Sequence, residues 1–250
     1  MLKRWRIASE TILATAVLII IKLVVEYFGL EFVTINPLFT SIIAGGIFLF
    51  GLILAGTLAD YKESEKIPAE IVSACESLYQ EGRYVKETKP DFNLDAFSHL
   101  LRKIVMCFTA DVHDPDSRKC LSALTELSRF YMEMERLGVP PNYIARLKSE
   151  ESSLRKSLLR MYYIQKTDFL PSSYILVQSI VALILILLVL TKIEPFYDSL
   201  LTITFLTYIF VYILKLLKTL DKPFRAGERT KDDVSLFLLR EFKDRLETGK

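Results

Sequence analysis

Cysteine and histidine are scarce in this sequence, which holds three cysteines and two histidines in 250 residues. An odd number of widely spaced cysteines suits neither a disulfide framework nor a zinc site. We therefore expect Cys75, Cys107 and Cys120 to be reduced thiols that pack as small apolar side chains. The segment that starts at His113 is faintly similar to a metal motif, but capping and turn chemistry explain its two aspartates better. The sequence predicts no metal and no other cofactor.

A charge excess and the common catalytic motifs are also missing. The net charge of +2 gives no reason to expect a nucleic-acid partner. There is no nucleophile–base motif, no Walker loop and no HExxH spacing, so nothing predicts an enzyme. Alternating strand patterns and internal repeats are absent from the sequence as well. We therefore expect an all-α protein that is not an enzyme.

Long apolar runs are what the sequence does have. Hydrophobic residues make up 51% of the chain and charged residues 25%, and the mean hydropathy is +0.30, which fits a chain divided between lipid and water. Four runs are long enough to cross a hydrocarbon core of about 30 Å as a helix. The sequence therefore predicts an integral protein of the lipid bilayer with four transmembrane helices: Ile7–Phe28, Pro37–Leu58, Tyr174–Thr191 and Tyr197–Leu217.

Basic residues lie before the first apolar run and after the last. Lys3, Arg4 and Arg6 precede the first run, and Lys215–Arg229 is rich in lysine and arginine, whereas the short connectors within each pair of runs have almost no basic excess. The positive-inside rule then places both termini in the cytoplasm of a cell-membrane protein. The expected organisation is transmembrane helices 1 and 2 in 1–59, a cytoplasmic helical domain in 60–171, transmembrane helices 3 and 4 in 172–220, and a cytoplasmic turn with an amphipathic tail helix in 221–250.

Apolar residues in the middle segment recur every three or four positions, which is typical of amphipathic helices. One such face holds Ile67, Ile71, Cys75 and Leu78. We expect helices over Ile67–Leu78, Phe92–Thr109, Arg118–Leu137 and Asn142–Thr167. The tail helix is expected over Asp232–Leu246, with its apolar face formed by Val234, Phe237, Leu238 and Phe242.

The second apolar run has the most unusual pattern. At about 100° per residue, one of its faces is small and weakly polar with a single bulky belt, and is formed by Thr40, Ala44, Ile47, Gly51 and Ala55, with Phe48 beside them. Close helix packing explains such a face, because small residues are enriched where membrane helices meet. The alternative is a pore-lining stripe whose hydrophobic constriction lies at the bulky belt. The stripe alone favours packing.

Lys22 and Glu26 lie one helical turn apart near the outer end of the first run. Charged residues at membrane depth are costly and face protein or water. Our interpretation is that Lys22 extends its ammonium group to the interface and pairs locally with Glu26. The alternative is that both residues line a charged outer mouth.

Two short stretches resemble the bestrophin family, most nearly its compact prokaryotic members. The second run passes through Gly56–Tyr61 into Ile67-Pro68, and the fourth run is followed by Asp221-Lys-Pro223-Phe224 and then Gly227, which is similar to the family's Asn-Pro-Phe-Gly turn. In architecture the resemblance covers nearly the whole chain. It implies a four-helix membrane subunit with a helical cytoplasmic domain, assembled into a ring.

The resemblance also implies a function. Bestrophins are pentameric ion channels, commonly anion-conducting, in which five second spans surround the pore and bulky apolar residues form a neck. Counting back from Tyr61, the neck falls near Thr40, Ala44 and Phe48, on the face that periodicity selects. This agreement favours the pore over packing. We therefore expect a homopentameric chloride channel whose partners are ions and further copies of the chain.

The chain departs from the family pattern at two places. Thr40 and Ala44 are small where the family has bulky neck residues, so Phe48, together with Ile47, is left to close the neck. The acidic run of calcium-activated members is replaced by Arg225–Arg229, so we expect no calcium site there. The alternative function is a non-conducting membrane scaffold or regulatory protein that acts through its cytoplasmic helices.

Overall fold

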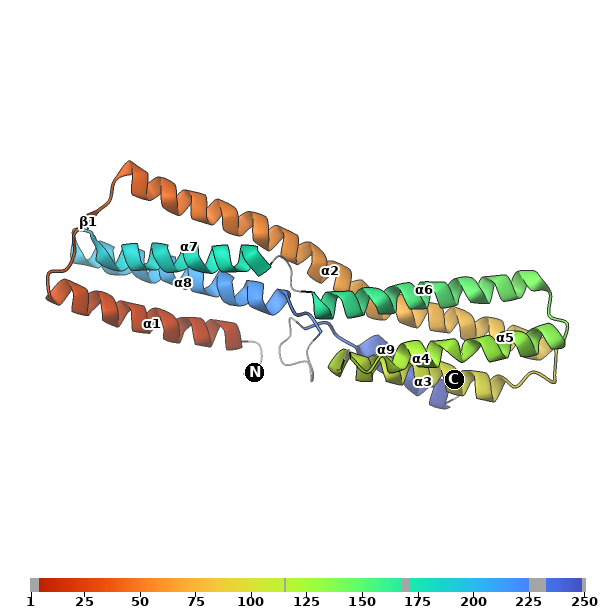
Figure 1. Cartoon of the computed structure of the whole chain (residues 1–250). Helices are drawn as coiled ribbons and strands as arrows, with labels where there is room; N and C mark the ends of the chain where they lie inside the picture. Colours follow the sequence, from red (N-terminus) through yellow and green to blue (C-terminus); the bar gives the residue numbers. More distant parts are fainter. Residues whose placement is uncertain (1–4, 115, 168–170, 225–232, 249–250) are drawn as a thin grey trace. The chain divides into compact units, whose positions relative to one another are not determined.

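The computed structural model describes residues 5–114, 116–167, 171–224 and 233–248. These residues are almost entirely helical, which confirms the all-α class (Figure 1). The chain divides into two units: the first holds the described residues up to 61 and from 171 to 222, and the second holds 62–167 and the C-terminal segment 233–248. The elements in chain order are α1 (Arg6–Tyr27), β1 (Val33–Thr34), α2 (Pro37–Thr88), α3 (Leu94–His113), α4 (Lys119–Thr125), α5 (Leu127–Arg136), α6 (Pro141–Lys166), α7 (Pro171–Leu190), β2 (Thr191–Lys192), α8 (Phe196–Leu220) and α9 (Phe237–Thr248).

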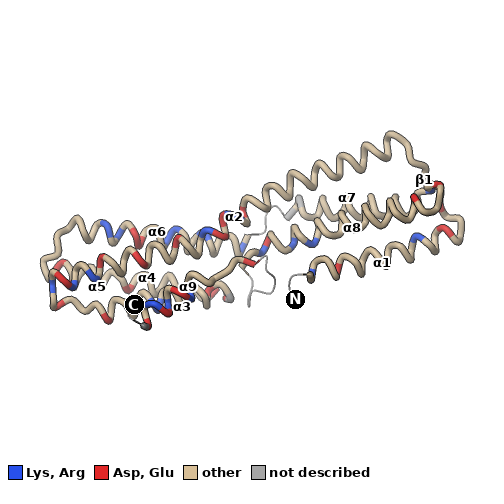
Figure 2. The backbone as a smooth tube through the Cα atoms, turned by 180° about the vertical axis from the view of Figure 1, so that it is seen from behind, with Lys and Arg blue, Asp and Glu red and all other residues tan. Residues whose placement is uncertain are grey.

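The first unit contains the apolar helices. Helices α1, α2 and α8 are long and apolar enough to cross a membrane, and α7 contains a shorter apolar helix, Tyr174–Leu190. The 20 residues of α7 extend about 30 Å, which is close to the thickness of the hydrocarbon core. Within the first unit, charged residues are few along these helices and gather near the ends of the unit (Figure 2). The first unit thus has the composition of a helical membrane protein.

Helices α7 and α8 lie between α1 and the first part of α2 (Figures 1 and 2). The rings of Phe50 on α2 and Phe210 on α8 lie 5.5 Å apart in a core that Val181 and Ile184 of α7 complete. This core fixes which face of α2 is turned towards its own subunit.

Contacts at the two ends of the first unit set its topology. Glu10 near the start of α1 pairs with Lys215 near the end of α8 at 3.1 Å. At the other end, β1 and β2 form a short parallel ladder in which Val33 lies opposite Thr191. The two connectors within the helix pairs are therefore at one end of the unit, and the start of α1 and the end of α8 are at the other.

The second unit has a conventional apolar core. The face of α2 that periodicity selected, from Ile67 to Leu78, is buried, and so are Phe97, Ile104 and Phe108 of α3. Cys75 and Cys120 are fully buried free thiols, and burial raises the pKa of Cys75 to about 12. Both buried thiols are therefore protonated and pack as apolar groups.

Two helix boundaries differ from the sequence prediction. Pro68 lies inside α2 and does not end it, so the helix expected over Ile67–Leu78 is continuous with the second apolar run in one 52-residue helix. A proline ring removes one backbone donor, and packing on both sides of the position keeps the helix continuous. The expected helix Arg118–Leu137 is divided at Glu126 into α4 and α5.

The tail helix also differs from its prediction. Helix α9 begins at Phe237, so Val234 precedes the helix, and Phe237 itself is exposed. Its buried residues include Leu239 and Phe242, which are three positions apart. Of the predicted apolar face, Val234 and Phe242 are buried and Leu238 is half-buried, whereas Phe237 is exposed because the helix starts later than predicted. Asp232, Gly227 and the basic segment Arg225–Arg229 lie outside the described residues.

Candidate functional site

The residues proposed to line a pore all lie on the exposed side of α2. Phe48 is 66% exposed and Ile47 51% exposed, and the remaining members, Thr40, Ala44, Gly51 and Ala55, are exposed as well. Few large apolar residues keep so much surface in a folded subunit unless lipid or another subunit covers them. This face of α2 is therefore available to a partner or to a central pathway.

The opposite face of α2 packs on its own subunit. Its buried residues are Phe39, Gly46, Phe50 and Thr57. Gly46 brings α2 close to α7, since a Cβ atom at this position would lie 2.7 Å from Cδ1 of Ile184. The stripe of Thr40 to Ala55 is thus not the face through which α2 packs within the chain.

A third sector of α2 is bulky and apolar. Leu38 is 71% exposed and Leu52 56% exposed, and both lie about 100° or more from the centre of the buried sector when each residue advances the helix by ~100°. Helix α2 therefore has a packed sector, a bulky apolar sector and a small, weakly polar sector. Such a division suits a helix that has its own subunit, a neighbour or lipid, and a pathway around it.

The structure corrects the interpretation of Lys22. Its side chain is fully buried within the chain, and its ammonium group pairs with Glu31 rather than with Glu26. The ammonium also donates hydrogen bonds to the backbone carbonyls of Val189 at 3.2 Å and Thr191 at 2.6 Å. These carbonyls lie at the C-terminal end of α7, where the helix dipole favours a cation.

The burial of Lys22 removes its charge from the proposed outer mouth. Its charge is balanced by Glu31 and by two carbonyl groups, so the group acts as an internal connection between α1, the first connector and the end of α7. Glu26 is half-buried, and one of its carboxylate oxygens has no hydrogen-bond partner among the described residues. A charged mouth formed by both residues therefore keeps only Glu26 as a candidate.

The turn after α8 is held by a backbone hydrogen bond. Helix α8 ends at Leu220, and Asp221 is its C-terminal cap. Pro223 and Phe224 are buried, and the carbonyl of Pro223 accepts a hydrogen bond from the backbone N–H of Val234 at 3.0 Å. The Pro-Phe turn thus ties together chain segments on either side of the undescribed residues 225–232.

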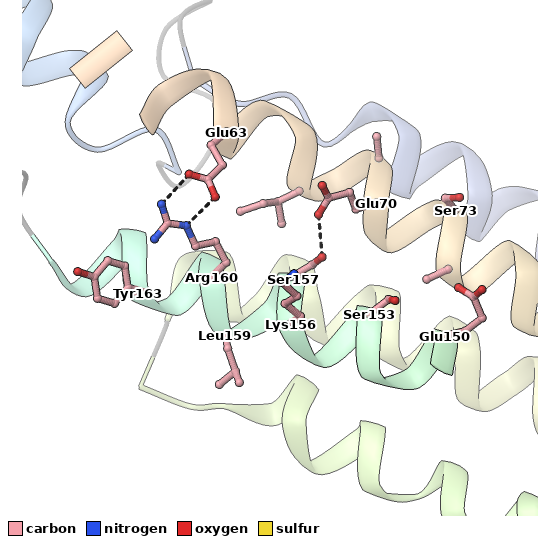
Figure 3. A pocket seen from close by; sticks show the side chains of 13 residues that line it. Glu63, Glu70, Ser73, Glu150, Ser153, Lys156, Ser157, Leu159, Arg160 and Tyr163 are labelled. Carbon is pink, nitrogen blue, oxygen red and sulfur yellow. Dashed lines mark hydrogen bonds and ion pairs between the residues drawn. The ribbon is translucent and has the colours of Figure 1, made fainter. Parts of the chain in front are cut away.

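An open groove of about 950 Å³ lies between α2 and α6 in the second unit. Glu63 and Arg160 point toward one another across it and form two hydrogen bonds, at 2.9 and 2.6 Å (Figure 3). These bonds hold the pKa of Glu63 below its ordinary value, so its carboxylate is ionised at neutral pH. Further along, Ser157 donates a hydrogen bond to Glu70 at 2.8 Å. Two acidic residues of α2 are therefore engaged by α6.

A buried carboxylate that the sequence analysis did not select organises the second unit. Asp111, fully buried, accepts hydrogen bonds from the backbone N–H groups of Lys119 at 3.1 Å and Cys120 at 2.8 Å, at the start of α4. It also accepts bonds from the hydroxyls of Ser117 and Tyr162. Burial, with a contribution from Asp111, raises the pKa of Tyr162, so its hydroxyl keeps the proton that it donates.

The described residues contain no group of three or more His, Cys, Asp or Glu side chains that could hold a metal ion. The two aspartates that follow His113 have structural roles. Asp114 is the C-terminal cap of α3, and Asp116 pairs with Lys166 of α6.

Comparison with solved structures identifies the fold of this chain. No protein-family model matches the sequence, and no curated protein matches it either. Among solved structures, a bacterial bestrophin homologue from Klebsiella pneumoniae is 14% identical and superimposes with a TM-score of 0.82, covering 96% of this chain and 97% of that chain. The chain has the bestrophin fold.

Other solved structures agree with this assignment. A variant of the Klebsiella pneumoniae homologue is also 14% identical, with a TM-score of 0.82 and coverage of 96% of this chain and 98% of that one. A structure described as a membrane protein is 15% identical, with a TM-score of 0.78 and coverage of 98% and 97%. The bestrophin fold accounts for both units, since the likeness extends over nearly the whole of each chain.

Proposed function

We propose that copies of this chain assemble into a ring, a pentamer, whose α2 helices surround an ion-conducting pathway with a hydrophobic neck at Phe48. The observation that carries the proposal is the exposure of the small and weakly polar face of α2 in a chain with the bestrophin fold. A single copy would expose this face to lipid, whereas a closed ring turns it towards a shared axis.

Anions are the proposed substrate, with both termini in the cytoplasm. The class of ion comes from the family resemblance, and the orientation from the basic residues around the first and last spans. The stripe from Thr40 to Ala55 contains no acidic residue that would attract cations. With Lys22 buried and paired, any charge that selects ions must lie elsewhere on the pathway.

Phe48→Ala tests the proposed neck. A ring of bulky apolar side chains excludes water from a narrow passage, and smaller side chains let the passage hydrate. Purified protein in planar bilayers should conduct, and Phe48→Ala should raise the current per channel or the open fraction at least about threefold.

Leu52→Ala is the matched control, because Leu52 is similarly exposed but belongs to the bulky apolar sector of α2. It should leave the current near that of the unchanged protein. Assembled rings that pass no ions with either Phe48 or Ala at this position would contradict the channel and favour the non-conducting scaffold. An equal increase from both substitutions would contradict Phe48 as the neck.

A further inference from the structure

The pore-facing stripe of α2 continues beyond the apolar span, and there it carries positive charge. One unbroken α-helix runs from Pro37 to Thr88. Eighteen residues make about five turns, so Lys62 takes the same angular position on α2 as Ala44, and Lys66 the same position as Phe48. Both lysines are exposed.

Neither lysine forms an ion pair or a hydrogen bond with another residue that the structure describes. Lys66 contributes electrostatically to the lowered pKa of Glu63, but Arg160 is the main partner of that carboxylate. The acidic residues nearby point elsewhere, since Glu63 is bound by Arg160 and Glu70 by Ser157, both on α6 (Figure 3). The groove therefore draws these two carboxylates away from the face that carries the lysines.

Asp60 lies on the other side of α2 from the stripe, so Glu65 is the acidic residue that shares this face with the lysines. It is exposed and has no partner among the described residues, and it lies at the edge of the stripe, at the same angle as Ile47. Each copy thus presents one ammonium group near the centre of the face, that of Lys62, and one ammonium group and one carboxylate at its two edges, those of Lys66 and Glu65. In a ring, the balance on this face is positive.

We propose that Lys62 and Lys66 form the selectivity element of the channel, a basic ring on the pathway just beyond the neck that concentrates chloride and excludes potassium. This inference rests on the proposed function and names the residues that choose the ion. Rings of charged side chains set ion selectivity in pores, because a confined space focuses their field and raises the local concentration of the opposite ion.

Reversal potentials measured in a tenfold potassium chloride gradient across a planar bilayer test the proposal. The unchanged protein should prefer chloride. The double substitution Lys62→Gln with Lys66→Gln should lower the chloride-to-potassium permeability ratio at least about threefold, and the double Glu substitution should move it towards potassium. Glu65→Gln should move the ratio in the opposite direction, towards chloride.

Lys119→Gln with Lys148→Gln is the control. It removes the same charge from exposed positions on α4 and α6 and should leave the reversal potential unchanged. Each variant is also measured with Phe48→Ala, so that a closed neck does not hide the selectivity.

Different results would contradict the channel and the selectivity role of Lys62 and Lys66. Conducting rings whose reversal potential is the same with Lys, Gln and Glu at positions 62 and 66 would overturn the selectivity element and leave the channel standing. Assembled rings that conduct in neither background would overturn both.

Discussion

At the residue scale, two buried charges shape this protein in ways that differ from their local sequence context. Lys22 has Glu26 one turn away, yet it binds Glu31 and the end of α7. Asp111 lies within an amphipathic helix, yet it caps the start of α4 and receives the hydroxyl of Tyr162. Buried charges persist where several donors or acceptors converge on them, and these convergent partners come from distant segments.

Asp111→Asn should destabilise the second unit by roughly 2–3 kcal/mol, because hydrogen bonds to a charged group are worth more than neutral ones. The amide also turns a donor towards groups that are themselves donors. Thermal unfolding of the purified protein, followed by circular dichroism, measures the loss. Asp114→Asn is the control, since Asp114 is exposed and should tolerate the change. Equal effects of the two substitutions would contradict the role given to Asp111.

At the element scale, α2 combines three surfaces on one helix. Its buried sector packs through Gly46 and Phe50, its bulky sector carries Leu38 and Leu52, and its small sector carries the proposed pathway. Helical periodicity found the small sector from the sequence. Only the packing of Gly46 against α7 showed that this sector faces away from the rest of the subunit.

Gly45 and Gly46 are neighbours on α2 but lie in different sectors, Gly45 in the bulky apolar sector and Gly46 in the packed sector. A Leu side chain at Gly46 would meet Ile184 and Ile180 of α7, and we expect a loss of at least about 1–3 kcal/mol from overpacking. Gly45→Leu is the control, because nothing lies within 4 Å of a Cβ atom there and the position shares the sector of Leu38 and Leu52. The melting temperature in detergent should fall for Gly46→Leu and hold for Gly45→Leu. The reverse order would show that α2 is turned differently.

At the scale of the whole molecule, the exposed face of α2 is the feature that bears on assembly. Phe48 and its neighbours on the stripe require a cover that the chain does not supply from its described residues. The bestrophin fold supplies a reason for that surface if copies meet around an axis. The oligomer is therefore the first property to measure.

The mass of the detergent-solubilised complex checks the ring directly. Five chains of 28.8 kDa give about 144 kDa of protein, which native mass spectrometry or light scattering resolves from four or six copies. A stable monomer would sink the pore proposal. A ring of another size would keep the pathway and change its width.

The sequence by itself determined the apolar helices, the helical class and most buried faces of the second unit, because each depends on residues close in the chain. Length and hydropathy define a span, and a period of about 3.6 residues defines the buried face of a helix. The same period selected the stripe of α2 and, extended past the apolar span, places Lys62 and Lys66 on it. The short Asp221–Phe224 turn and the order of spans indicated the bestrophin fold.

Tertiary structure decided the rest. The partner of Lys22 at the end of α7 lies 167–169 residues away, and the hydroxyl that reaches Asp111 lies 51 residues away. Such pairs have no periodic signal, because the free energy of a buried charge depends on which groups the fold brings around it. The engagement of Glu63 by Arg160 is of the same kind. The sequence thus identified the small, weakly polar face of α2, and the fold decided which charged side chains near that face are bound by α6.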